Sequence, residues 1–404
     1  MNHAGWVSSS DRALTMAAAQ VRLIRAVTPA NADNELAELG AAFSRGTPRL
    51  PRWRYDAPPF PAELPRALEE LAVFLEKEPP LGPYYAARAR ELCLEAAIVA
   101  ATGTPKLTAL ARQRFFEGWT PDDVRRAEEL AQDWTRQSAA SIDQAPTFAD
   151  LEMGGAERVR SCDPKDPRSL LSRMASEVGR KRLPMRIATQ SGMASLAATG
   201  DGVILIAENK WLSLRDIERT VLHEVEGHAL PRARAACAPV AIFALGTARG
   251  IDDQEGRAIT IEERVGFLDQ ARKFELGCRH LAACAALDGA DFIEIVALLR
   301  GRGASLEDAL RIGARVQRGS LGTGGLAREV IYLTARCKVE RLFAGPDGCK
   351  IEQVMRGGRV AADVALELAG ILSDEGHGQR GERAGHFGPS EPATTNRGAA
   401  NAAR

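Results

Sequence analysis

Segments that could form β-strands are confined to one short part of this 404-residue chain. Residues 183–189, 193–199 and 202–207 are short β-compatible runs, and the turn residues Gly200 and Asp201 make the last two a β-hairpin. On both sides of these runs, apolar residues recur at helical spacing instead. The sequence therefore predicts an α+β fold that is mostly helical, with a small β-sheet.

Helical patterns fill the first 140 residues of the chain. Amphipathic helices are predicted over 11–27, 63–77, 83–101 and 121–136, and prolines stand at or before the start of the last three. We therefore expect an N-terminal helical region over residues 1–140.

Three further divisions follow from changes in composition. A polar stretch over 141–168 is the expected connection, and a second folded domain is expected over 169–372. The tail, 373–404, is rich in Gly, Ser and Arg and nearly free of large apolar residues, so we expect it to be disordered.

Composition excludes several classes of protein. The 53 basic and 53 acidic residues cancel, so neither nucleic acid nor an anionic membrane is expected as the main partner. No apolar run approaches the length of a membrane span, and the N-terminus lacks the pattern of a secretory signal. The seven cysteines are scattered and never spaced as CxxC, which favours reduced thiols and a cytoplasmic location. The sequence does not indicate an oligomeric state.

One helical segment, 213–231, carries the candidate chemistry. Ser213 can cap its start, with Asp216 three residues later. His223 and Glu224 are expected to lie away from the apolar face. That face is expected to bury Leu214, Ile217, Val221 and Val225.

The histidine pair within this segment has an unusual spacing. Zinc helices commonly carry H-E-x-x-H, but this motif is H-E-V-E-G-H, with His223 and His228 five residues apart. On a regular helix these side chains would diverge by about 140°. A π-type turn would return them to one face, Gly227 tolerates that distortion, and Pro231 indicates that the helix soon ends.

Zinc chemistry assigns a role to each residue of the motif. Neutral imidazoles are good zinc ligands, and catalytic sites use three protein ligands with an open fourth position. Glu224 would act as the general base on a zinc-activated water. The alternative is that two ordinary histidines share a helix with a glutamate by chance, and the motif alone leaves this open.

Other sequence blocks resemble a known family. The H-E-x-x-x-H motif followed by Q-E-G-x-A at 254–258 resembles the DUF1704 family, which includes bacterial QEGLA-motif proteins and eukaryotic tyrosine carboxypeptidases that act on tubulin. The segment RVQRGSLGTGGLAREVIYL at 315–333 is similar to a third family block. VTPANADNELAEL (27–39) and RWRYDAP (52–58) are similar to N-terminal ones, so the resemblance covers most of residues 10–345.

This resemblance implies that residues 169–372 are the zincin-like catalytic domain of a metallopeptidase that binds one Zn²⁺ ion. It makes His223, His228 and Glu255 the metal ligands and Glu224 the general base. The residues themselves leave Glu262 and Glu263, about two turns later, as competitors for the third ligand. They also allow Asp252 or Asp253 to cap the helix of Glu255, and Gly256 to let that helix approach the metal helix closely.

The same blocks suggest how a substrate is held. Arg315, Arg318 and Arg328 are candidates to bind a terminal carboxylate through a guanidinium fork, although each is individually compatible with a surface arginine. Tyr332 could donate to an oxyanion or be a core tyrosine. The strand at 193–199 could offer an open edge to an extended peptide.

The chain also departs from the family pattern, and the departures bear on the substrate. Arg257 stands in place of the leucine of QEGLA, Glu226 lies inside the metal motif, and Arg328-Glu329 replaces a common Lys-Asp pair. These departures leave the proposed ligands in place but put the identity of the substrate in doubt. The motif and the resemblance together lead us to expect a zinc carboxypeptidase that acts on the C-terminus of a peptide or protein. An endopeptidase or other amide hydrolase, and a non-catalytic zinc-binding regulatory protein, are the alternatives.

Overall fold

A computed structural model describes residues 3–56, 61–136, 157–193, 195–200, 202–238 and 240–372. Helices make up 62% of it, and the sheets are small, as the sequence predicts. Within these ranges, no helix is both long and apolar enough to span a bilayer.

Before residue 137, every regular element in the described ranges is a helix. These helices are α1 (His3–Val21), α2 (Leu23–Val27), α3 (Ala32–Ser44), α4 (Leu64–Leu75), α5 (Gly82–Ala100), α6 (Lys106–Phe115) and α7 (Pro121–Trp134). The helix predicted over 11–27 starts earlier and is divided at Arg22, whose left-handed conformation (φ 35°) separates α1 from α2. Thr120 ends the preceding turn and accepts a hydrogen bond from the Asp123 N–H, which caps α7.

Two small sheets follow. One pairs β1 (Arg158–Arg160) with β5 (Trp211–Ser213), and the sequence did not predict it. The other has the order β2-β4-β3, with β2 (Arg186–Gln190) parallel and β3 (Ala197–Thr199) antiparallel to β4 (Val203–Ala207). The predicted β3–β4 hairpin is therefore present, with shorter strands than expected, and β3 lies at an edge of its sheet.

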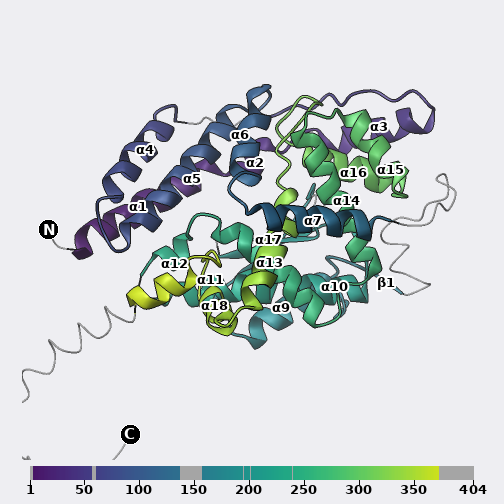
Figure 1. Ribbon diagram of the computed structural model, residues 1–404. Coiled ribbons are helices and arrows are strands. Elements are labelled where there is room, and N and C mark those ends of the chain that lie inside the picture. Colours follow the sequence, from purple (N-terminus) through teal and green to yellow (C-terminus); the bar gives the residue numbers. More distant parts are fainter. Residues whose placement is uncertain are drawn as a thin grey trace, which may run out of the picture.

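Helices dominate the remainder of the described chain. They are α9 (Leu170–Arg180), α10 (Leu214–Leu222), the π-helix η2 (His223–Ala229), α11 (Leu230–Ala235), α12 (Ile242–Leu245), α13 (Gly250–Arg264), α14 (Gln270–Leu287), α15 (Phe292–Gly301), α16 (Leu306–Val316), α17 (Val330–Phe343) and α18 (Gly348–Met355). α13 packs against both η2 and α17, and α13 and α17 lie near the middle of the molecule (Figure 1).

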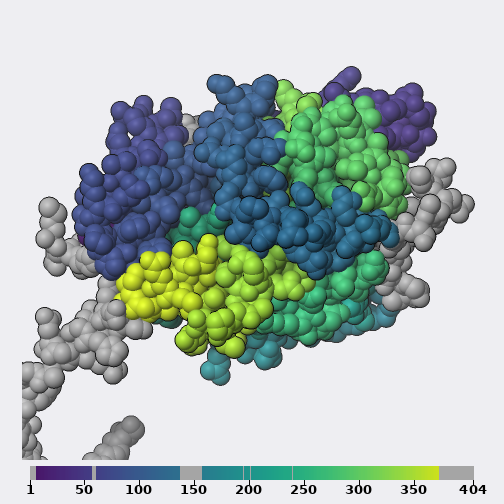
Figure 2. Space-filling view, in the orientation of Figure 1, coloured from purple at the N-terminus to yellow at the C-terminus, as the bar shows by residue number. Residues whose placement is uncertain are grey.

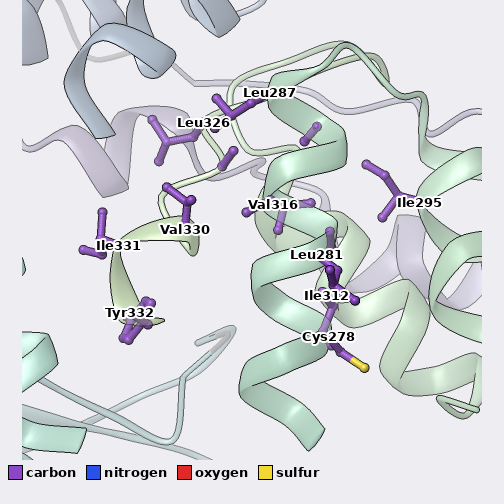
Figure 3. Close-up of a cluster of buried hydrophobic side chains, with 14 of the residues drawn as sticks. Cys278, Leu281, Leu287, Ile295, Ile312, Val316, Leu326, Val330, Ile331 and Tyr332 are labelled. Carbon is purple, nitrogen blue, oxygen red and sulfur yellow. The ribbon is translucent and has the colours of Figure 1, made fainter. Parts of the chain in front are cut away.

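The N-terminal helices share apolar cores with the C-terminal ones. One core joins residues of α6 and α7 to α14, α16 and α17, and its C-terminal part is drawn in Figure 3, from Cys278 on α14 to Tyr332 on α17. A second core joins α1, α4 and α5 to residues 351–368, and Figure 2 shows the blue-violet and yellow segments side by side at the left of the view.

The predicted domain divisions stay predictions. The tail 373–404 and residues 141–156 of the expected connection lie outside the described residues. Residues 158–160 of that connection form β1.

Candidate metal centre

The metal-motif segment is built from a capped helix that changes to a π-helix. Ser213 accepts a hydrogen bond from the Asp216 N–H at 3.0 Å, so the predicted cap is confirmed. Ile217, Val221 and Val225 are buried, but Leu214 is 42% exposed because it begins the helix at the end of β5, and its predicted burial was wrong. The predicted π-turn is present as η2, His223–Ala229.

The π-helix places the two motif imidazoles beside one carboxylate. His223 Nε2 and His228 Nε2 lie 3.3 Å apart. Glu255 Oε2, from α13, lies 3.4 Å from His223 Nε2 and 3.6 Å from His228 Nε2. Zinc bonds of about 2.0–2.2 Å in tetrahedral geometry put ligand atoms about 3.3–3.6 Å apart. The three side chains therefore fit a zinc ion, and they form a His/Cys/Asp/Glu cluster of metal-binding size within the described ranges.

The two competing glutamates have other partners. Glu262 Oε1 lies 2.6 Å from Nδ1 of His223, so it can accept the second ring N–H while Nε2 faces Glu255. The guanidinium of Arg272 holds the other oxygen of Glu262 at 3.0 Å. Glu263 pairs instead with Arg336, at 2.6 Å. A metal-ligating histidine commonly donates its other nitrogen to a carboxylate in this way.

Glycines permit the close packing around Glu255, but not as the sequence reasoning expected. A Cβ on Gly256 would lie 2.4 Å from the carbonyl carbon of Ala335, so Gly256 faces α17 and not the metal helix. The π-helix η2, which carries the histidine motif, approaches α13 at Gly227. A Cβ added to Gly227 would lie 2.7 Å from the Cβ of Ala258. Contact between η2 and α13 therefore depends on the glycine inside the motif.

The two aspartates that precede Glu255 do not cap its helix. α13 begins at Gly250, after Arg249, and no side chain caps it. Asp252 pairs with Arg114 of α6 at 2.7 Å, and Asp253 pairs with Lys338 of α17 at 2.8 Å. The capping prediction was wrong because α13 starts a turn earlier than expected. The aspartates instead tie α13 to its neighbours through buried ion pairs.

The electrostatics of the cluster favour a bound cation. Burial lowers the pKa of His223, but its hydrogen bonds to Glu255 and Glu262 outweigh burial and raise the pKa to about 10. Burial raises the pKa of Glu255, but His228, His223 and Arg328 outweigh it and hold the pKa well below its usual value. Glu255 therefore stays ionised, and the carboxylates of Glu255 and Glu262 favour positive charge at His223, where the ligand atoms converge.

Glu224 lies next to the first histidine and is held by the small sheet. Its side chain is buried, and the hydroxyl of Thr199 donates to Glu224 Oε2 at 2.7 Å. Thr199 is the last residue of β3, the edge strand that packs against η2. The edge strand therefore orients the candidate general base.

Tyr332 lies among arginines close to the cluster. Arg328 connects Tyr332 to the metal-ligand cluster. One of its guanidinium nitrogens lies 3.3 Å from Glu255 Oε1, and another lies 3.4 Å from the Tyr332 hydroxyl. Arg315 donates to the same hydroxyl at 3.4 Å and to Glu329 at 2.5 Å. Tyr332 is 92% buried (8% exposed), so it also belongs to the core.

Arg318 differs from the other two candidate arginines. Within the described ranges its guanidinium has no hydrogen bond or ion pair, whereas Arg315 is held by Glu329 and Arg328 contacts Glu255. Burial, together with repulsion from Arg315, lowers the pKa of Arg318 to about 10. Arg318 is thus a half-buried cation that no carboxylate of the described chain pairs with.

Sequence reasoning did not identify Thr199 or the supporting role of Glu262. The signal for Glu262 was its spacing: seven residues after Glu255, it lies on the same helical face. Thr199 carried no local signal, because its contact with Glu224 depends on how β3 packs on η2.

Comparison with known proteins identifies the family. No curated protein and no solved structure matches the chain. Residues 42–363 match the family model described as microtubule-associated tyrosine carboxypeptidase, MATCAP, which is related to but not the same as the family expected from the motifs. Membership indicates a carboxypeptidase-type peptidase. Because the match covers most of its length, the chain belongs to the MATCAP family.

Proposed function

We propose that this protein is a zinc-dependent carboxypeptidase of the zincin type, which removes C-terminal residues from a peptide or protein. The observation that carries the proposal is the convergence of His223, His228 and Glu255, with ligand atoms 3.3–3.6 Å apart. These residues would hold the zinc. When bound, zinc would lower the pKa of a water molecule and polarise the scissile carbonyl.

Glu224 is the proposed general base. Its carboxylate would take a proton from the attacking water and pass it to the leaving amine. The Thr199 hydroxyl, 2.7 Å from Glu224 Oε2, would keep one carboxylate oxygen occupied and the other free for this transfer. A non-catalytic zinc site would have no use for a carboxylate held in this way.

Tyr332 is the proposed oxyanion donor. Arg315 and Arg328 both donate to its phenol oxygen at 3.4 Å. In the described part of the chain, the Tyr332 hydroxyl donates its own hydrogen to no acceptor. The hydroxyl would therefore donate to the developing negative charge on the substrate, where two cations reinforce its polarity.

Arg318 is the proposed receptor for the substrate carboxylate. A half-buried guanidinium that has no counter-ion among the described residues gains much from an incoming anion, and its planar fork matches a carboxylate. Arg315 and Arg328 would contribute positive potential at the same place. The family name refers to tyrosine and microtubules. For this chain we propose only a C-terminal carboxylate, and peptides ending in tyrosine belong in the substrate panel.

The test compares matched peptides with free and amidated C-termini, cleaved by the wild type, Glu224→Gln and Arg318→Leu. We expect Glu224→Gln to bind zinc without cleaving. We expect Arg318→Leu to raise KM for free C-termini, with Arg52→Leu as a control at an exposed arginine. Equal cleavage of amidated peptides would indicate the alternative endopeptidase. Zinc binding without any Glu224-dependent cleavage would indicate the regulatory alternative.

The seven cysteines are free thiols, in agreement with the proposed cytoplasmic location. Cell fractionation tests this, and recovery from an oxidising compartment would contradict it.

A further inference from the structure

Arg257 is a buried cation beside the metal centre that the proposed reaction does not use. It is 1% exposed and lies two residues after Glu255 on α13. Its Nη1 donates to the backbone carbonyl of Glu226 at 3.0 Å. No carboxylate lies within ion-pair distance of it in the described residues, and its Nε has no hydrogen-bond partner. A guanidinium is costly to bury without a counter-ion, so the hydrogen bond to the Glu226 carbonyl is the feature that must account for its position.

The hydrogen-bond pattern of the π-helix explains why the Glu226 carbonyl needs this donor. In a π-helix, a carbonyl accepts from the N–H five residues later, and in an α-helix from the one four residues later. The N–H of Leu230 donates to Val225, five residues back. The next π-type donor, to Glu226, would be residue 231, which is proline and has no N–H. Because the Leu230 N–H, which would be the α-type donor, goes to Val225, neither the α-type nor the π-type backbone donor serves the Glu226 carbonyl.

We propose that Arg257 is a positioning residue for the metal centre, whose guanidinium replaces the N–H that Pro231 lacks and so holds the five-residue register of η2. The inference rests on the proposed zinc site. Glu226 lies two residues before His228, and Arg257 lies two residues after Glu255. One hydrogen bond thus joins the two ligand-bearing elements close to both ligands. Arg257 itself is too buried to contact a substrate.

The inference also accounts for the departure from the QEGLA pattern. Arginine in place of leucine introduces a charge where the family motif has an apolar side chain. In this chain a proline lies four residues beyond Gly227, where it removes a donor from the π-turn. Arg257 and Pro231 are therefore a compensating pair, and each should make the other tolerable.

The experiment is a double-mutant cycle on zinc affinity, measured by competition with a chromophoric chelator, with the visible spectrum of the Co²⁺-substituted protein as a second readout. Arg257→Leu should lower zinc affinity about 10- to 100-fold and alter the Co²⁺ bands. Pro231→Ala restores the missing N–H and should leave affinity unchanged. In the double variant it should recover the affinity and spectrum that Arg257→Leu loses.

Two results would overturn the inference: unchanged zinc affinity in Arg257→Leu, or a loss that Pro231→Ala does not rescue. If Arg257→Leu alone does not fold, recovery of folding in the double variant supports the pair, and failure to recover contradicts it. Cleavage is assayed separately. A wild type that binds zinc but cleaves nothing refutes the proposed function alone, whereas one that binds no zinc refutes both.

Discussion

Glu262→Gln separates the role of a supporting carboxylate from that of a metal ligand. The substitution keeps the size of the side chain and an oxygen for the His223 Nδ1–H, at present 2.6 Å from Glu262, but removes the charge. Loss of a carboxylate behind a ligating histidine weakens metal binding about 10- to 100-fold. That range corresponds to about 1.4–2.7 kcal/mol.

The same substitution should also lower the free energy of unfolding. Glu262 is 1% exposed and ion-paired with Arg272, and breaking a buried pair costs about 3–5 kcal/mol. Arg272 keeps a second partner, Glu275, at 2.8 Å, so we expect a loss below that range. Urea unfolding measures this loss in the free energy of unfolding separately from zinc affinity.

Chelator competition on three matched variants tests the reasoning. Glu255→Gln removes a proposed ligand and should lower zinc affinity most, Glu262→Gln should be intermediate, and Glu263→Gln should match the wild type. The reasoning is refuted if Glu263→Gln loses as much affinity as Glu255→Gln, or if Glu262→Gln loses none.

Three further predictions concern the surroundings of the site. Thr199→Val should lower kcat about 10-fold or more with zinc content unchanged, because Glu224 loses its orienting hydrogen bond. An unchanged kcat would contradict this role of Thr199. Gly256→Ala should lower the free energy of unfolding by about 1–3 kcal/mol, because its Cβ would meet the Ala335 backbone. Gly179→Ala, where a Cβ meets nothing within 4 Å, is the control, and equal melting temperatures for the two variants would contradict this. Burial lowers the pKa of His280 from 6.5 to about 4. Between these values the unfolded chain binds the proton more readily, so stability should fall by up to about 3 kcal/mol as pH drops from 6.5 to 4. His280→Leu should flatten the dependence of the free energy of unfolding on pH between 6.5 and 4, as measured by urea titrations at each pH. An unchanged slope would show that His280 is not the cause of this dependence.

Local features of the structure could be predicted from the sequence. The five-residue spacing of His223 and His228 required a π-turn, and the structure has one at η2. Ser213 caps α10, and β3 and β4 form the expected hairpin. Each of these depends on spacing, capping or turn chemistry within a few residues.

Features that depend on contacts between distant segments could not be predicted. The β1–β5 sheet joins strands about fifty residues apart. Gly256 faces α17 instead of the metal helix, and Asp252 and Asp253 pair with other helices instead of capping α13. Packing decided each of these, and no local pattern distinguishes a capping aspartate from one in a buried ion pair.

The central claim is that His223, His228 and Glu255 hold one zinc ion. Crystals of the wild-type protein purified with zinc, measured on both sides of the zinc absorption edge, test it most directly. We predict one anomalous peak, about 2.0–2.2 Å from the two Nε2 atoms and from a Glu255 oxygen. A peak coordinated by Glu263, or zinc-loaded crystals with no peak between these three side chains, would contradict the account.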